Sequence, residues 1–405
     1  GSTFENDIIP YAAVWSHLFQ HINTNPNLAA EATPLMPLSR NPLSISDQKT
    51  IFDWINQGAP SENGAIPYMT VKQKIFVVNE GDDRVTILDD STHRIVRMTS
   101  VGVSANPLSP SCLAMTPDKQ SFILGAVNSN GTVCKYNASD CSAMTQFNSG
   151  YYINDLAVTP DGMKGYITDY PPSVIQRFGI FDASAMKMMK SVSYPGFSGS
   201  FGIAITHDGK YAYISGASSD NVVKVDTKMD SVIAIFRVGS DVPMPVPDGY
   251  VPKYLPGYMT ISPDDKYLYL GCRNSSELLT IATANDSIIN RTPLTYTPFR
   301  SALSPDGSEL WITAWGSNEV KVMNTSSYVV TATIDSINTN PRAIAFSADG
   351  SVAYVACEKL VGGLHNHGLN GGAPPSGIYV IDRRSKTILY TFAAPGFSTS
   401  IGTSF

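Results

Sequence analysis

Ser304-Pro305-Asp306-Gly307 is one copy of a short pattern that recurs through this chain and decides its fold. The other copies are Thr116-Pro117-Asp118, Thr159-Pro160-Asp161-Gly162, Thr206-His207-Asp208-Gly209, Ser262-Pro263-Asp264-Asp265 and Ser347-Ala348-Asp349-Gly350. Successive aspartates of the pattern are 43, 47, 56, 42 and 43 residues apart. A repeat of about 40–45 residues is typical of one four-stranded blade, and a ring of such blades is a β-propeller.

Each copy of the pattern lies between stretches that are typical of β-strands. Ala343–Phe346 precedes the last copy as a short apolar strand, and Tyr267–Leu270 and Val222–Asp226 are examples of second and third strands. In the third strands apolar and polar residues alternate, as in a sheet with a period of two. Gly accepts positive φ and Asp caps its own backbone, so Asp-Gly suits the turn between two strands.

A first repeat without the pattern completes the set of seven. Tyr68–Val71 is predicted to open it, and three more strands are predicted at Lys74–Asn79, Arg84–Asp89 and Arg94–Val101. We therefore predict a mainly β fold, a seven-bladed β-propeller at residues 65–405 with a small N-terminal α-helical segment at residues 1–64.

The end of the chain repeats an earlier stretch. Pro395–Ser400 matches Pro195–Ser200, which leads into the first strand of the fourth repeat. The tail is therefore expected to reach the ring centre beside the first blade. Either the tail or Tyr68–Val71 supplies the first strand of that blade.

The composition excludes several classes of protein. The 405 residues carry a net charge of −6 and no basic run, which argues against nucleic acid as a partner. No stretch reaches the roughly 18–20 apolar residues of a membrane-spanning helix. The low lysine content favours an extracytoplasmic location, in the periplasm or at the surface of a bacterium. The opening Gly1-Ser2 is typical of a cloning remnant, so we expect the natural N-terminus to be missing.

The five cysteines do not decide the redox environment. Cys134 and Cys141 flank a short hairpin-like stretch and are predicted either to form a disulfide or to remain thiols. A disulfide would indicate an oxidising compartment. The other three, Cys112, Cys272 and Cys357, lie in apolar strand patterns and are predicted to be buried thiols.

Residues 66–405 resemble the YVTN-type propellers, a repeat family of surface proteins and cytochrome-d1-like domains. The matching parts are the lead-in Pro341–Ala345, the Ser-Pro-Asp-Gly turn and the aromatic-rich second strand Ala353–Ala356. The resemblance implies the propeller fold. It implies no particular activity, because function in such folds depends on the loops.

Residues 3–64 do not follow the repeat and are predicted to be helical. Pro10–Asn23 has Val14, Leu18, Phe19 and Ile22 on one helical face. A second helix is predicted to begin at Ser44, which is followed by Asp47 as in a capping box, and to end at Gly58.

The order of these parts resembles the C-terminal part of a class I cytochrome c domain. The matching pieces are Ser16–Phe19, Met36-Pro37, Leu43-Ser44 and Trp54–Pro60. By this resemblance Met36 would be the axial ligand of haem iron. The chain contains no Cys-x-x-Cys-His sequence, so covalent haem attachment is excluded here. We expect no cofactor in this chain and haem c in a full-length form, unless the domain is a haem-free remnant.

Two long loops are predicted on the same face of the ring. Asp241–Gly257 connects two repeats, and Leu360–Gly377 lies between the second and third strands of the last repeat. Both kinds of loop lie opposite the Asp-Gly turns. We predict a site there for a small anionic or aromatic ligand, lined by Arg273, Arg300, Arg342, Trp315, Tyr250 and Tyr254. The arginines are alternatively structural partners of carboxylates.

His365 and His367 form the most metal-like stretch of the propeller, a His-x-His pair in a Gly-rich loop. They provide two ligands for a metal ion, and the sequence identifies no third. No phosphate-binding loop, nucleophile elbow or catalytic dyad is recognisable, so catalytic residues stay unknown.

Three functions are consistent with these features. The first is an exported binding or redox-accessory propeller, fused to a mono-haem cytochrome c in the full-length product and serving a small ligand or a redox partner in electron transfer. The second is an enzyme, either a lactonase-like metal-dependent hydrolase or an oxidoreductase that uses the propeller channel. The third is a surface adhesion module.

Overall fold

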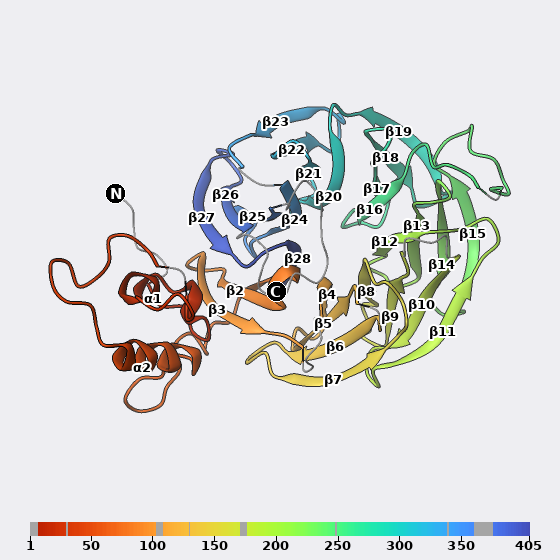
Figure 1. The fold of residues 1–405 in the computed structure, drawn as a ribbon. Helices are drawn as coiled ribbons and strands as arrows, with labels where there is room; N and C mark the ends of the chain where they lie inside the picture. Colours follow the sequence, from red (N-terminus) through yellow and green to blue (C-terminus); the bar gives the residue numbers. More distant parts are fainter. Residues whose placement is uncertain are drawn as a thin grey trace. The chain divides into compact units, whose positions relative to one another are not determined.

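The structure is a computed structural model, and it describes residues 7–29, 31–102, 108–128, 130–170, 176–247, 249–337, 340–359 and 376–405. Its fold is mainly β, a seven-bladed β-propeller with few helices (Figure 1). The predicted fold class is therefore confirmed. No helix among the described residues has the length and apolar character that crossing a membrane would require.

In the described residues the strands form seven four-stranded sheets, and six of these contain strands that are consecutive in the chain. The first three of the six are β4 (Pro110–Met115), β5 (Ser121–Ala126), β6 (Thr132–Asn137) and β7 (Ala143–Asn148); β8 (Leu156–Val158), β9 (Lys164–Thr168), β10 (Arg177–Asp182) and β11 (Lys187–Ser193); and β12 (Ser200–Ile205), β13 (Tyr211–Gly216), β14 (Asn221–Asp226) and β15 (Ser231–Arg237).

The other three are β16 (Pro256–Ile261), β17 (Tyr267–Cys272), β18 (Glu277–Ala282) and β19 (Ser287–Pro293); β20 (Thr297–Leu303), β21 (Glu309–Trp315), β22 (Glu319–Asn324) and β23 (Val330–Ile334); and β24 (Asn340–Phe346), β25 (Val352–Glu358), β26 (Ser376–Asp382) and β27 (Ile388–Ala394). In Figure 1 the first strand of each sheet lies on the inner side of the ring and the fourth on the outer side.

The seventh sheet joins the two ends of the propeller sequence. Its order is β28 (Ser398–Thr403), β1 (Lys74–Asn79), β2 (Arg84–Asp89) and β3 (Arg94–Ser100). The C-terminal strand therefore supplies the first strand, and the Asn79 side chain donates to Ser398 Oγ at 2.7 Å. The prediction that Tyr68–Val71 opens this blade was wrong, because these residues lie outside any strand.

The recurring Ser/Thr-Pro-Asp pattern forms the turn between the first and second strand in all six sheets, as predicted. In each copy the Ser or Thr hydroxyl donates to the Asp carboxylate at 2.6–2.7 Å. The same hydroxyl accepts from the backbone N–H five residues later, and the carboxylate accepts from the N–H two residues after the Asp. One hydroxyl and one carboxylate thus accept hydrogen bonds from the backbone N–H groups of the turn, which explains why these residue types recur.

These turns predict a loss of stability in acid. Contacts with Lys210, Ser262 and Ser351 lead the causes that lower the pKa of Asp208, Asp264 and Asp349, respectively, to about 2 from the ordinary 3.8. A carboxylate whose pKa falls on folding stabilises the protein above its unfolded pKa. We expect the urea midpoint of unfolding to fall as the pH decreases from about 4 towards 2, and to fall less for Asp349→Asn. Equal midpoints at pH 5 and pH 3 would contradict this.

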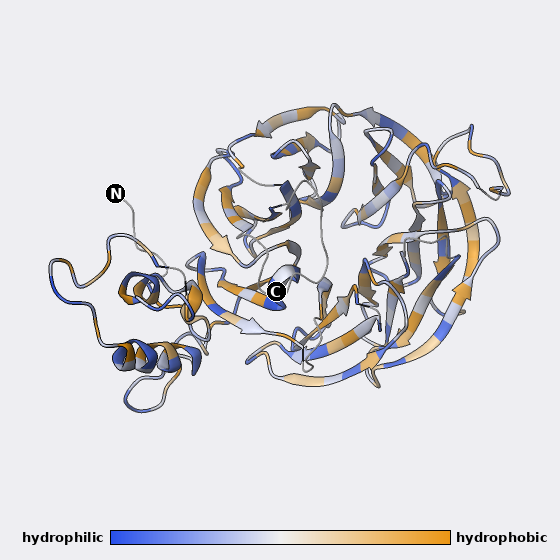
Figure 2. Cartoon of the chain, viewed as in Figure 1, coloured by the Kyte–Doolittle hydropathy of each residue, from blue (hydrophilic) through white to orange (hydrophobic). Residues whose placement is uncertain are grey.

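The hydrophobic cores lie between neighbouring sheets. One core contains Trp311, Val320 and Val322 of one sheet with Phe346 and Val355 of the next, all at most 7% exposed. Four further cores join the preceding sheets in the same way. Apolar residues accordingly gather along the strands in Figure 2. Because the middle strands are covered on both faces, even Lys224 in β14 is only 8% exposed, which differs from the one-sided sheet that alternation suggests.

Contacts divide the chain into two compact units. One comprises residues 1–76, 84–101 and 403–405, and the other comprises residues 77–83 and 102–402. The first unit contains the 3₁₀ helix η1 (Ala13–Trp15) and the helices α1 (His17–Ile22) and α2 (Ile45–Asn56). The second unit contains most of the sheets and a further 3₁₀ helix, η2 (Glu80–Asp82).

The first predicted helix is present only in part, as η1 and α1. The continuous helix predicted at Pro10–Asn23 is interrupted at Ser16, which has an extended backbone. The buried Ser16 hydroxyl accepts from Ile9 N at 2.8 Å and donates to Ala12 O at 3.0 Å, so it holds a bend instead of a helical turn. The second helix follows the prediction, because Ser44 caps it by accepting from Asp47 N at 3.1 Å.

Candidate functional site

The inner strands of the larger unit contain bulges at one level. The pairing of first and second strands shifts register between Ser200 and Ile203, Pro256 and Met259, Pro298 and Ser301, and Pro341 and Ala343. A bulge changes the direction in which side chains leave a strand. The bulged residues include Phe201, Tyr258, Phe299, Arg300 and Arg342. This level is the end of the sheets opposite the Asp-Gly turns, since first strands begin here and second strands end here.

Aromatic rings from four successive sheets form a continuous row at this level. The ring centroids of Tyr170 and Phe201 are 4.9 Å apart, and those of Phe201 and Tyr258 are also 4.9 Å apart. Tyr258 and Phe299 follow at 5.2 Å, and Phe299 and Trp315 at 6.4 Å. Edge-to-face pairs dominate the row, a geometry that favours aromatic packing.

Three guanidinium groups lie over three successive rings of this row. The guanidinium carbon of Arg273 is 4.0 Å from the centroid of Phe201, that of Arg300 is 3.5 Å from Tyr258, and that of Arg342 is 4.5 Å from Phe299. A cation over an aromatic face in a desolvated site contributes about 2 kcal/mol. We call this set the arginine–aromatic cluster; its members are Arg273, Arg300, Arg342, Tyr170, Phe201, Tyr258, Phe299 and Trp315.

Two buried carboxylates pair with two of the arginines. Glu358 is fully buried; it accepts from Arg342 Nη1 at 2.7 Å and from Trp315 Nε1 at 2.8 Å. Asp155 accepts from Arg300 Nη2 at 3.3 Å. Burial alone would lower the pKa of both guanidinium groups. The net effect is the opposite, because Glu358 raises the pKa of Arg342. Tyr258 and Asp155 likewise raise the pKa of Arg300.

The surroundings of Asp155 act on its carboxyl in opposite directions. Burial raises the pKa of its carboxyl above the ordinary value, while Arg300 and the N–H of Ile203 act in the opposite direction. The Ile203 N–H donates to Asp155 Oδ2 at 3.0 Å. The neighbouring Asn154 side chain donates to the Tyr258 hydroxyl at 3.0 Å, which joins this carboxylate region to the aromatic row.

The structure brings four of the six predicted ligand-binding residues together: Arg273, Arg300, Arg342 and Trp315 belong to the cluster. Tyr250 and Tyr254 have other contacts. The Tyr250 hydroxyl donates to the buried Asp220 at 2.8 Å, and the Tyr254 hydroxyl donates to Asp241 at 2.6 Å. These contacts hold the long connection between β15 and β16 in place.

The predicted metal ligands His365 and His367 lie outside the described residues, as does most of the loop Leu360–Gly377. Among the residues that the structure does describe, no group of three or more His, Cys, Asp or Glu side chains is arranged to hold a metal ion. A metal site at this loop stays a prediction.

The haem prediction concerns Met36 in the helical unit. Its side chain is 41% exposed, and its N–H donates to His21 O at 2.7 Å. The residues present do not fit a covalently attached haem, since the chain lacks the cysteine pair that would hold one.

Cys134 and Cys141 are both buried thiols in this structure, and burial raises the pKa of Cys134 to about 11.

Sequence reasoning missed the aromatic row and the two carboxylates. The missed residues are Tyr170, Phe201, Tyr258, Phe299, Asp155 and Glu358. A signal was present, because a Pro is the first or second residue of the first strand at Pro256, Pro298 and Pro341, and an aromatic residue or arginine follows within two residues. Which ring meets which arginine depends on the bulges, which the sequence does not specify.

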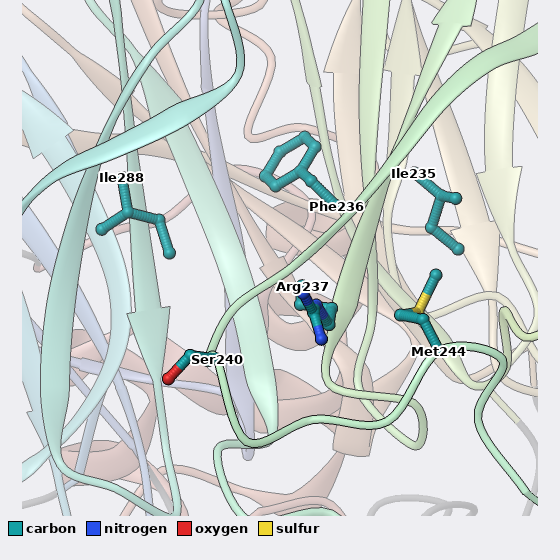
Figure 3. Close-up of a pocket in the computed structure, with 7 residues that line it drawn as sticks. Ile235, Phe236, Arg237, Ser240, Met244 and Ile288 are labelled. Carbon is teal, nitrogen blue, oxygen red and sulfur yellow. The ribbon is translucent and has the colours of Figure 1, made fainter.

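A groove lies on the outer side of the propeller, away from the cluster. It has a volume of about 620 Å³ and is lined by Ile235, Phe236, Arg237, Gly239, Ser240, Met244 and Ile288, from β15, β19 and the connection that follows β15 (Figure 3). It contains none of the predicted site residues. Arg237 Nη1 donates to Val242 O at 3.1 Å, so its head group helps to hold the connection.

Neither a family model nor a curated protein matches this sequence. Solved structures match over most of it. A protein provisionally assigned as a 6-phosphogluconolactonase from Bacteroides fragilis matches with a TM-score of 0.64 at 12% identity, over 83% of this chain and 99% of that chain. A functionally unknown protein from Desulfotomaculum acetoxidans matches with a TM-score of 0.60 at 14% identity, over 82% and 98%. Hydrazine synthase from Kuenenia stuttgartiensis matches with a TM-score of 0.59 at 18% identity, over 77% and 92%. At these identities the likeness shows the β-propeller fold alone.

Proposed function

We propose that this chain is a binding β-propeller whose arginine–aromatic cluster holds a small organic anion. The observation that carries the proposal is the set of three guanidinium groups over adjacent aromatic rings. A buried cation is costly unless it has a counter-charge, and two of the three have a carboxylate partner. A bound anion would complete the charge balance of the set.

The exposure of the cluster supports access for a small molecule. Trp315 is 37% exposed, and the side chains of Arg300 and Arg342 are 19% and 12% exposed. The site is therefore open to solvent at Trp315 and largely buried at Arg300 and Arg342. Such an arrangement, with aromatic walls and a few fixed polar groups, is common in small-molecule sites.

Calorimetry with small anions tests the proposal. We expect benzoate to bind the purified protein with measurable heat and to change the tryptophan emission through Trp315. Trp315→Phe should remove the emission change and keep a heat of binding, because Phe preserves the stacking on Phe299. Arg237→Gln, which removes a charge from the outer groove, should bind like the parent. The absence of binding by any anion would contradict the proposal, as would loss of binding in Arg237→Gln alone.

The alternative function is that of a lactonase-like hydrolase. The observation in its favour is Asp155, a buried carboxyl whose raised pKa and contact with Arg300 suit a general base beside a cation. Two similar structures come from proteins provisionally assigned as 6-phosphogluconolactonases. Acid release from an aldonic acid lactone, measured with and without added divalent cations and abolished in Asp155→Asn, would support this alternative.

The cellular setting is part of the proposal and rests on the sequence alone. We propose an exported protein whose full-length form carries a mono-haem cytochrome c before the propeller. The basis is the resemblance of Ser16–Phe19, Met36-Pro37 and Trp54–Pro60 to the end of such a domain. A haem absorbance band in the full-length gene product, isolated from its own cells, would support this part, and its absence would remove it.

A further inference from the structure

Arg273 differs from the other two arginines of the cluster. Arg300 pairs with Asp155 and Arg342 with Glu358, whereas no carboxylate in the described part of the chain lies within ion-pair distance of Arg273. Burial lowers the pKa of Arg273, and the hydroxyls of Tyr170 and Tyr258 oppose this effect. The group remains cationic at neutral pH, because the ordinary value for arginine is so high.

Two atoms of Arg273 lack hydrogen-bond partners. Nε and Nη2 are both buried, and neither has an acceptor among the described residues. These atoms share one edge of the guanidinium plane, and their N–H bonds point in the same direction. Buried donors without acceptors are rare and need an explanation, and this edge is the one that takes a carboxylate through two parallel hydrogen bonds.

We infer that this edge of Arg273 binds the carboxylate group of an organic acid, whose carbon part lies against the aromatic row. This inference rests on the proposed function and specifies its ligand. A planar anion with two oxygens matches the two parallel donors. A single negative charge matches the single cation that has no carboxylate partner, whereas a phosphate dianion would leave an excess charge in a buried site.

The surroundings of Arg273 fit the organic part of such a ligand. Phe201 lies beneath the guanidinium, and Tyr170 and Tyr258 contact Phe201 at its two sides. Arg300 and Arg342 are then positioning residues, since each lies over the next ring of the row and each already has its carboxylate. Nε of Arg300 and of Arg342 is also buried without an acceptor among the described residues, but of the three only Arg273 has two such donors on one edge, so we assign recognition of the charged group to Arg273.

Four probes of similar size separate the chemistries. Benzoate is a planar monoanion, benzenesulfonate a tetrahedral monoanion, phenylphosphonate a tetrahedral anion of higher charge, and benzamide is neutral. At pH 7 we expect benzoate to bind at least about tenfold more tightly than any other probe. Arg273→Lys keeps the charge and loses the paired donors, and it should weaken benzoate binding at least about thirtyfold. The matched control, Arg237→Lys in the outer groove, should leave benzoate binding unchanged.

A measurement on the parent protein keeps the test independent of the folding of the variant. In a sample with ¹⁵N-labelled arginine, benzoate should shift one Nε–H resonance downfield, whereas benzamide should not. Tighter binding of phenylphosphonate than of benzoate would overturn the carboxylate assignment while supporting an anion site. Unchanged benzoate binding by Arg273→Lys would overturn the role of Arg273. No binding of any probe would instead overturn the proposed function.

Discussion

Glu358→Gln is expected to lower the free energy of unfolding by about 3 kcal/mol, because it removes one charge of a buried ion pair. Glu358 is fully buried at the end of β25 and accepts from Arg342 at 2.7 Å and from Trp315 at 2.8 Å. Gln keeps the size and one acceptor oxygen but leaves the buried guanidinium without this carboxylate. The measurement is urea unfolding at pH 7, followed by circular dichroism.

Glu319→Gln is the matched control for this experiment. Glu319 pairs with Lys321 at 2.8 Å, and its side chain is 27% exposed. A pair with this much access to water contributes at most about 1 kcal/mol. We therefore expect a clearly smaller effect for the control. Equal effects of the two substitutions would mean that the Arg342–Glu358 pair does not hold the base of the cluster.

The blade arrangement could be predicted because the information that specifies it is local. The hydroxyl of Ser304 reaches only as far as Asp306 and Glu309, so a turn of this kind leaves its pattern within six residues of sequence. The first blade was predicted less well. Its inner strand is β28, more than 300 residues from β1 in sequence, and such a pairing leaves no local pattern. Only the similarity of Pro395–Ser400 to Pro195–Ser200 pointed to it.

The candidate site was predictable in part for a related reason. Arg300 lies six residues before Asp306 and Arg342 lies seven residues before Asp349, so the repeat placed both at the start of a first strand. Their partners are distant, since Asp155 is 145 residues from Arg300 in sequence. The pairing also depends on the bulges, which no pattern in the sequence marks. Sequence periodicity therefore identified the cations but not the rings and carboxylates that surround them.

Gly202 lies where two neighbouring inner strands approach each other closely. A Cβ atom at Gly202 would lie 2.6 Å from Gly257 O and 2.7 Å from Tyr258 Cα, both backbone atoms of the neighbouring inner strand β16. These atoms cannot move aside as a flexible side chain does. The absence of a side chain at Gly202 thus permits β12 and β16 to approach, and this approach brings Phe201 and Tyr258 to 4.9 Å.

Gly202→Ala is therefore expected to lower the free energy of unfolding by about 2–3 kcal/mol and to weaken ligand binding at the cluster. The matched control is Gly257→Ala in the facing strand, where the nearest atoms to an added Cβ are 3.4 Å away or more. Gly257→Ala should lower the free energy of unfolding by less than about 1 kcal/mol, since the added Cβ would make only ordinary van der Waals contacts. Urea unfolding of both variants and benzoate calorimetry of Gly202→Ala provide the measurement. Gly257→Ala is a control for stability only, because its added Cβ would lie 3.6 Å from Arg273 Nε. If Gly202→Ala unfolds like the control and binds benzoate like the parent, the spacing of the inner strands does not determine the geometry of the aromatic row, and the rings must be held by their arginines instead.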